Sequence, residues 1–145
     1  MANFYKNAFY DPTVTTAVTT YTCPSNANAI IVPQGFKGAA IANSDFELQL
    51  RLNATPSTAF SYTSYSDNVE YDLTGTTTIT GGTIIGQGYL AGKGISVGTV
   101  NGNGFNFDYQ LGQTIAGASD TLTLCAKGAS NGDDVCGTLK WYDLT

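Results

Sequence analysis

The sequence predicts a single-domain, all-β protein, an antiparallel β-sandwich of jelly-roll type with about eight or nine strands. Thr, Gly, Ala, Asn, Ser and Tyr dominate the composition, and charged residues make up only 12%. Thr, Tyr, Val and Ile suit a pleated, half-buried surface, whereas Gly and Asn suit turns. Segments of alternating apolar and polar residues recur about every ten to fifteen residues, with turn residues between them. The length of 145 residues suffices for one domain with its own core.

Three strands are predicted in the first third of the chain. Residues 13–22 alternate and end before Pro24, because Pro cannot donate to a strand ladder. Residues 29–32 form a short apolar strand that Pro33 and the following Gln-Gly are expected to end. Residues 46–52 show the clearest alternation, which predicts a strand with one face in the core and one in water. The apolar face carries Phe46, Leu48, Leu50 and Leu52, and the polar face carries Glu47, Gln49 and Arg51.

The rest of the chain continues the strand pattern, with one segment that the pattern leaves open. Residues 58–65 place Phe60 and Tyr62 in step on one face. Residues 74–104 are rich in Gly and Thr, which is compatible with short strands joined by bulges or with an exposed arm or loop. Further strands are predicted at residues 95–100, 105–111, 121–126 and 136–142.

Charge and hydropathy exclude two classes of partner. The formal net charge is −5, and the six Lys and Arg residues are spread along the chain. A surface that follows a phosphate backbone needs clustered cations, so we expect no nucleic-acid partner. No stretch approaches the roughly 20 apolar residues that span a bilayer, so we expect no membrane partner. The first residues lack a signal-peptide pattern, and synthesis in the cytoplasm without export is expected.

The three cysteines, Cys23, Cys125 and Cys136, are sparse and odd in number, which does not indicate a disulfide framework. Cys125 and Cys136 flank a predicted hairpin and could face each other across it. The alternative is that both are small buried apolar side chains. The sequence leaves this pairing open.

The absence of histidine bears most on catalysis. It removes Ser-His-Asp and Cys-His nucleophilic sites, histidine metal sites and the commonest general base. The segment from Gly88 to Gly94 superficially resembles a phosphate-binding loop, but Ser or Thr does not follow its Lys93 and no helical pattern follows. We therefore expect a non-enzymatic protein without a cofactor.

Acidic residues supply two weaker candidates for chemistry. Glu47 and the acidic run of Asp67, Glu70 and Asp72 contain the carboxylates that a glycosidase would need, if the fold paired Glu47 with Glu70 across a cleft. A solvated strand edge is the simpler interpretation. The turn residues Asp120, Asp133 and Asp134 could supply oxygen ligands to calcium, although no EF-hand pattern is present. No metal site is predicted.

The aromatic residues, nine Tyr and seven Phe, are the most informative feature for binding. Phe4, Tyr5, Phe9 and Tyr10 cluster in residues 1–12, a predicted N-terminal arm preceding the sandwich domain of residues 13–145. Such an arm either docks on a neighbouring subunit, where aromatic side chains dominate interface energies, or folds back onto its own sandwich. Both alternatives stay open, and the four aromatics are candidate interface residues.

A second set of aromatic residues suggests a binding function of another kind. If exposed beside Asn and Asp, these rings would stack on sugar rings in a carbohydrate-binding module. The candidates are Tyr62, Tyr65, Tyr71, Tyr89 and Trp141.

Two ends of the chain resemble small virion structural proteins of tailed phages. The similarity covers about the first 35 residues and lies in Tyr-Lys-Asn-Ala at residues 5–8, a Thr-rich segment ending in Tyr-Thr-Cys-Pro at residues 13–24, and the apolar residues 29–32. The closing residues 139–145 are also similar, whereas the middle of this chain is longer and richer in Gly. No catalytic residue is carried over, because this group has no catalytic motif.

The resemblance implies a virion location and an assembly role. It suggests a capsid decoration (cement) protein that binds the major capsid protein or other virion proteins, with a tail or fibre component as the alternative. A homo-oligomer, with a trimer favoured, would also cover the edges of the predicted sheets. Glycan binding on the virion remains a further option.

Overall fold

A computed structural model describes residues 2–9, 16–22, 31–40, 45–65, 69–73, 78–90, 95–99, 111–113, 118–128 and 134–144. These residues contain no helix and twelve strands, nine of them three residues or longer. The prediction of an all-β protein is confirmed. The strands are β1 (Ala2–Phe9), β2 (Thr16–Thr22), β3 (Ile31–Ala40), β4 (Phe46–Leu52), β5 (Thr55–Pro56), β6 (Thr63–Ser64), β7 (Glu70–Asp72), β8 (Ile79–Thr80), β9 (Thr83–Leu90), β10 (Ile95–Thr99), β11 (Thr121–Gly128) and β12 (Asp134–Asp143).

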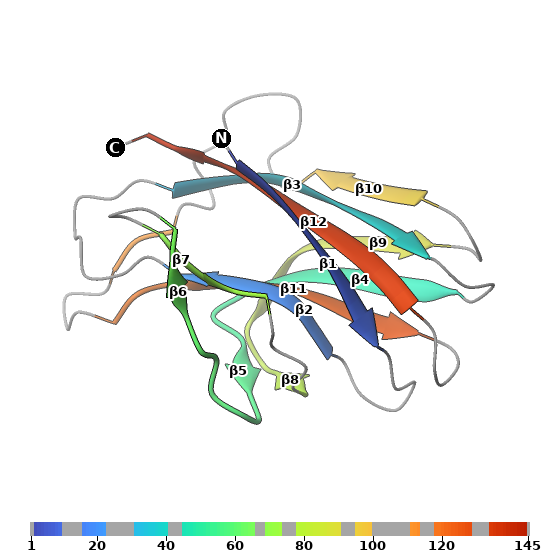
Figure 1. Ribbon diagram of the computed structural model, residues 1–145, viewed down its shortest axis with the longest axis horizontal. Helices are drawn as coiled ribbons and strands as arrows, with labels where there is room; N and C mark the ends of the chain where they lie inside the picture. Colours follow the sequence, from blue (N-terminus) through green and yellow to red (C-terminus); the bar gives the residue numbers. More distant parts are fainter. Residues whose placement is uncertain are drawn as a thin grey trace.

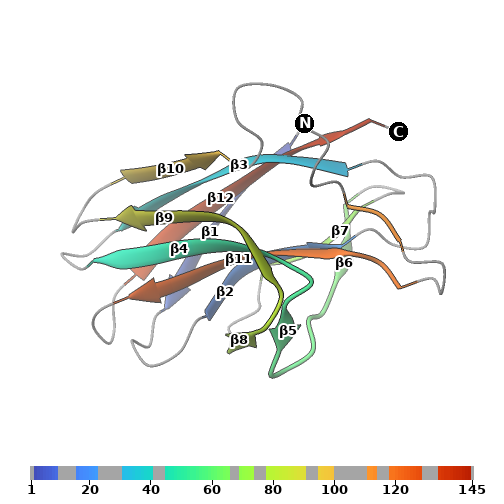
Figure 2. The same cartoon turned by 180° about the vertical axis from the view of Figure 1, so that it is seen from behind.

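The strands form two packed layers and one small addition. One layer is a four-stranded sheet in the order β1-β12-β3-β10, and the other is a six-stranded sheet in the order β6-β7-β2-β11-β4-β9. Figures 1 and 2 show the two layers face to face, with β5 and β8 on the side of the six-stranded sheet that points away from its partner. Among the described residues, β5 and β8 pair with each other as a separate two-stranded sheet.

The eight main strands have the jelly-roll connection. They pair from the ends of the chain inward: β1 with β12, β2 with β11, β3 with β10 and β4 with β9, all antiparallel. The additional pairs β12–β3 and β11–β4 join these four ladders into two sheets. This nesting is what results when one long antiparallel hairpin wraps into a sandwich. The predicted jelly-roll sandwich is therefore confirmed.

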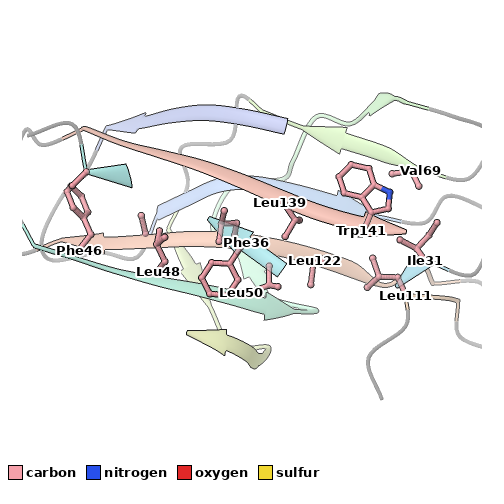
Figure 3. Packing of buried hydrophobic residues seen from close by; sticks show 13 residues of the cluster. Ile31, Phe36, Phe46, Leu48, Leu50, Val69, Leu111, Leu122, Leu139 and Trp141 are labelled. Carbon is pink, nitrogen blue, oxygen red and sulfur yellow. The ribbon is translucent and has the colours of Figure 1, made fainter. Parts of the chain in front are cut away.

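The core lies between the two sheets and uses the alternation that the sequence shows. On β4, Phe46, Leu48 and Leu50 are buried and point to the same side as Leu122 of β11 (Figure 3). Leu124 of β11 belongs to the same buried cluster. The four-stranded sheet contributes Phe36, Leu139 and Trp141, among others. Each fully buried Leu or Phe contributes roughly 1.5–3 kcal/mol through the removal of apolar area from water.

The two sheets approach closely at Gly38 of β3. A Cβ atom at this position would lie only 2.0 Å from Cδ1 of Leu48 on β4. A Cβ at Gly86 of β9 would similarly lie 2.7 Å from Cε1 of Phe36. In both places the missing side chain leaves the space that a large buried side chain of the opposite sheet fills, so large and small residues interdigitate.

One predicted strand boundary is wrong. Pro33 and the following Gln-Gly were expected to end a strand, but β3 continues through them to Ala40. The ladder with β12 shifts register there, because Trp141 pairs with Pro33 and Lys140 with Gly35. The bulge leaves Gln34 unpaired in that ladder, and bulges are one of the places where a strand tolerates Pro.

The Gly-rich segment, residues 74–104, forms strands in the part that the structure describes. β8 and β9 follow each other through Gly81 and Gly82, which have φ angles of 61° and 71° and form a tight turn. β9 then joins the six-stranded sheet and β10 the four-stranded sheet, so the chain crosses between layers. Residues 74–77, 91–94 and 100–104 lie outside the described residues, as does most of the predicted strand 105–111.

Of the two alternatives left open for Cys125 and Cys136, the pairing across a hairpin is not found. β11 and β12 follow each other in the chain but belong to opposite sheets. Cys125 is a free, buried thiol. Its neighbours along β11, Leu124 and Ala126, point into the core, so Cys125 points to the outer face of its sheet. The sequence pattern located the two strands correctly but did not show that they part into two layers.

Candidate functional site

The outer face of the six-stranded sheet carries a connected set of polar side chains. Glu47, Gln49 and Arg51 alternate with the core residues of β4, as the sequence predicts. Across the ladder, Glu47 lies opposite Tyr89 and Gln49 opposite Gln87 on β9. Directly opposed residues share one face of a sheet, so the five side chains gather over two strands.

Hydrogen bonds link these five side chains into one chain of donors and acceptors. Arg51 donates from Nη2 and Nε to Oε1 of Gln49, at 2.6 and 2.9 Å. Gln49 in turn donates from Nε2 to Oε1 of Glu47 at 2.6 Å. The same carboxylate oxygen accepts from Nε2 of Gln87, which lies 3.3 Å from the hydroxyl of Tyr89. Arg51 is anchored at its other end, because its Nη1 donates to the carbonyl of Gly81 at 2.7 Å.

The end of this network opposite Arg51 carries groups that are exposed or have unused hydrogen-bonding capacity. Tyr89 is 71% exposed. Among the described residues, no group donates to the second carboxylate oxygen of Glu47 or to the side-chain carbonyl of Gln87. We call the surface formed by Glu47, Gln87 and Tyr89 the bare half of the outer face.

The neighbouring part of the same face is covered by the chain itself. Cys125, Ala54 and Ile79 are buried there as a separate apolar cluster, and Phe60 packs against it. Ala54 precedes β5 and Ile79 belongs to β8, so the small two-stranded sheet of β5 and β8 lies over the larger sheet (Figure 2). We call these four residues the covered half of the outer face.

The buried thiol of Cys125 has no nucleophilic character. Burial raises the pKa of Cys125 to about 12, and the nearby Arg51 only partly opposes this effect. The thiol lies 3.8 Å from the carbonyl of Thr123, to which it donates a weak hydrogen bond. A neutral, enclosed thiol is a packing group, because the thiolate is the reactive form.

A second group of aromatic side chains, Tyr65, Tyr71 and Trp141, lies between the two sheets beside β6 and β7. The ring of Tyr65 meets those of Tyr71 and Trp141 edge-on, at centroid distances of 6.4 and 5.9 Å. The prediction that Trp141 is available to a sugar is wrong, because its side chain is only 2% exposed and belongs to the core. The alternation of residues 136–142 contained this information, since Leu139 and Trp141 share a face.

Tyr62 and Tyr71 are likewise partly withdrawn from solvent. Burial raises the pKa of Tyr62 to about 12, and the carboxylates of Asp72 and Glu70 add to this shift. Asp72 is buried and accepts a hydrogen bond from the backbone N–H of Ser61 at 2.9 Å. Tyr71 packs against the core cluster. Of the five predicted sugar-stacking residues, Tyr65 and Tyr89 are the exposed ones.

The acidic residues are not brought together as a glycosidase would require. Glu47 lies on β4 and Glu70 on β7, with β11 and β2 between them. Three strand spacings of about 4.8 Å place them roughly 14 Å or more apart, whereas catalytic carboxylates lie about 5–10 Å apart. Asp67 lies outside the described residues.

The carboxylate of Asp120, a calcium candidate, forms hydrogen bonds within the protein that join three loop segments. Its two carboxylate oxygens accept hydrogen bonds from Nδ2 of Asn53 at 2.8 Å and from the N–H of Gly112 at 3.0 Å. Asn53 has a φ of 53° and its side-chain oxygen accepts from the N–H of Thr121 at 2.9 Å. Asp133 and the side chain of Asp134 lie outside the described part. Within that part, no group of three His, Cys, Asp or Glu residues could hold a metal ion.

The N-terminal aromatic segment is placed by its backbone only. β1 pairs with β12 along its whole length, from Ala2 opposite Trp141 to Phe9 opposite Asp134. This arrangement matches the alternative in which the segment folds back onto its own sandwich. The side chains of Phe4, Tyr5 and Phe9, and all of Tyr10, lie outside the described part, so their role at an interface stays a prediction.

Sequence reasoning named Glu47 and Tyr89 separately but missed the amides that connect them. The sequence pattern places Gln49 on the polar face of a strand, but Gln87 lies in the Gly-rich segment whose structure the pattern leaves open. The available signal was the period-two spacing of Gln87 and Tyr89, which indicates a strand with one polar face.

Comparisons with known proteins add no relative to this description. Among the described residues, no helix is long and apolar enough to cross a membrane. No family model, curated protein or solved structure matches the chain.

Proposed function

We propose that this chain is a structural component of a phage virion, most specifically a capsid decoration (cement) protein that stabilises the particle by binding neighbouring subunits. The observation that carries the proposal is the nested pairing of eight strands into a jelly roll. Jelly rolls recur in viral capsid proteins and in lectins. Because one fold serves many functions, the proposal also draws on the phage-like sequence at the two ends of the chain.

The edges of the two sheets support an assembly role. β9 ends the six-stranded sheet and β10 ends the four-stranded sheet, and the two strands lie side by side (Figure 2). Neither strand contains a charged residue or Pro. Monomeric proteins usually protect sheet edges with charges, Pro or very short strands. An uncharged pair of edges on one side of the sandwich therefore suits self-association.

The oligomeric state tests the assembly part of the proposal. Multi-angle light scattering of the purified chain should give a multiple of 15.2 kDa, with a trimer expected. Ile84→Lys places a charge on the β9 edge at a position that is 43% exposed, and it should shift the protein toward the monomer. Ala59→Lys is the matched control, because it adds the same charge to an exposed position outside the strands. A monomer before any substitution would argue against self-association.

The virion location needs a separate test. Mass spectrometry of particles purified on a density gradient from cells that express the gene should find the chain in a fixed ratio to the major capsid protein. Particles that lack the chain should lose integrity at a lower temperature. Absence of the chain from purified particles would overturn the proposal, and a ratio of a few copies per particle would place it in the tail or fibre.

A further inference from the structure

We propose that the bare half of the outer face binds a neutral saccharide, with Tyr89 as the stacking surface and Glu47 and Gln87 as hydrogen-bonding partners. The inference does not depend on the particle proposal, since it concerns the chemistry of one surface. It selects one of the two exposed aromatic candidates and adds two polar residues to it.

Among the aromatic side chains that the structure describes, the ring of Tyr89 is the best placed for stacking. It is 71% exposed, whereas Tyr65 is 48% exposed and is held edge-on by two other rings. A Tyr ring combines an apolar face, which packs against the C–H face of a sugar, with a polar hydroxyl at its rim. The chain covers apolar side chains elsewhere on this face but leaves Tyr89 open.

The polar groups around Tyr89 complement sugar hydroxyls, each of which both donates and accepts. Glu47 and Gln87 each present an oxygen to which no described residue donates. The hydroxyl of Tyr89 lies 3.3 Å from the Nε2 of Gln87, which donates to it, and the hydroxyl proton remains available for donation. Two acceptors and one donor thus border the ring, an arrangement that suits adjacent hydroxyls of a pyranose.

The network behind these groups holds them in place before a ligand arrives. Gln49 is only 7% exposed and receives both Arg51 hydrogen bonds on one oxygen, which leaves its amide N–H to fix Glu47. Arg51 is in turn fixed to the turn at Gly81. Side chains that are already ordered lose less conformational entropy on binding, so weak contacts yield more net affinity.

Charge favours a neutral ligand over an anionic one. On this face the carboxylate of Glu47 lies opposite Lys127 of β11 and is joined to Arg51 through Gln49, so charges of both signs are present. The chain as a whole has a net charge of −5, which repels acidic polymers at long range. Neutral glucans, mannans or galactans therefore fit better than acidic polysaccharides or phosphorylated surfaces.

The test uses an array of neutral oligosaccharides, followed by titration calorimetry with the strongest binder. Tyr89→Ala should weaken binding at least tenfold, Tyr89→Phe should retain the stacking and lose less, and Gln87→Ala should weaken binding severalfold. Tyr65→Ala is the matched control, because Tyr65 is the other exposed large aromatic among the described residues and lies away from the proposed site. Thermal unfolding of each variant should show that the fold is retained.

Three results would overturn the inference. The first is the absence of binding to any neutral oligosaccharide at millimolar concentration. The second is binding that Tyr65→Ala abolishes and Tyr89→Ala leaves unchanged, which would move the site to the other aromatic group. The third is a loss of self-association in Tyr89→Ala without any glycan binding, which would assign this face to a protein interface.

Discussion

The two halves of one sheet face differ in what the chain does with them. In the covered half, the β5–β8 strand pair and Phe60 cover the sheet, and Ala54, Ile79 and Cys125 are buried there. In the bare half, Glu47, Gln87 and Tyr89 remain at the surface of the same sheet, and Tyr89 is 71% exposed. Gln49 lies at the boundary, opposite Cys125 on one side and opposite Gln87 on the other.

The difference shows that the chemistry of the side chains determines which half of the outer face is covered: the apolar half is buried and the polar half stays exposed. Covering the apolar half removes several apolar side chains from water, and each contributes roughly 1–3 kcal/mol. Covering the bare half would bury a carboxylate and an amide with unsatisfied oxygens, which costs roughly 1–3 kcal/mol for each neutral group and more for a charge. The chain therefore encloses one half, and the other remains available to a ligand.

The largest effect is expected from the opposite face of the same strand. Leu50 lies between Gln49 and Arg51 on β4 but points into the core and is fully buried. Leu50→Ala should lower the free energy of unfolding by about 3–4 kcal/mol, because it removes buried carbons and leaves a cavity. Urea unfolding measures this change, and Leu50→Met, which keeps the volume, should cost much less. A loss below about 1 kcal/mol for Leu50→Ala would mean that the sandwich core is not packed as described.

The next largest effect is expected at the turn between β8 and β9, because β8 is part of the strand pair that covers the apolar half of the outer face. Gly82 has a φ of 71°, and a Cβ there would lie 2.6 Å from the carbonyl oxygen of Leu52 and 2.8 Å from backbone atoms of Ala54. Gly82→Ala should therefore destabilise by about 2 kcal/mol, through left-handed strain and displacement of the β8–β9 turn. Gly81→Ala shares the positive φ without the close contact, since its nearest atom is 3.9 Å away, and should cost less. Equal losses of unfolding free energy in the two variants would show that the close contact with Leu52 and Ala54 contributes nothing to the effect.

A smaller effect, dependent on pH, is expected in the covered half. Burial raises the pKa of Cys125 from 9.0 to about 12 in the folded chain. The neutral thiol therefore favours folding fully below pH 9, and this contribution is lost as the pH rises toward 12. Cys125→Ala should cost about 1 kcal/mol at pH 7.

The comparison across pH isolates this thiol from the other titrating groups. Because the wild type alone loses the thiol contribution, Cys125→Ala should gain about 2 kcal/mol of stability relative to the wild type between pH 9 and pH 11, so that the difference between the two proteins reverses sign. Urea midpoints at pH 7, 9, 10 and 11 give this difference directly. A difference that stays constant with pH would show that the thiol is accessible to solvent.

Much of the fold was predictable because it depends on local alternation. The pattern of Phe46 to Leu52 predicts the strand, its core face and its wet face, and β4 has all three. The strand through Pro33 was not predictable, because the bulge that accommodates Pro forms only against β12. Trp141 was misjudged because a large ring with a polar N–H suits both a core and a binding surface.

The candidate site was only partly predictable for the same physical reason. The sequence indicates that Glu47 and Tyr89 are exposed, but not that they are neighbours. They lie opposite each other only because of the register between β4 and β9, and the hydrogen bond between Glu47 and Gln87 joins residues 40 positions apart in the chain. That ladder also contains a register shift between Leu50 and Arg51. The covering pair of strands, β5 and β8, has only two residues in each strand and is too short for its pattern to be detected from sequence.

The most direct test of the division between the two halves compares two aromatic residues on the same face. Phe60 packs on the covered half, whereas Tyr89 stands on the bare half. Urea unfolding of Phe60→Ala and Tyr89→Ala, measured under identical conditions, is the decisive measurement. Phe60→Ala should lose about 1–2 kcal/mol of stability, and Tyr89→Ala should stay within about 0.5 kcal/mol of the parent. Equal losses, or a larger loss at Tyr89, would contradict the account by making that ring part of the folding core.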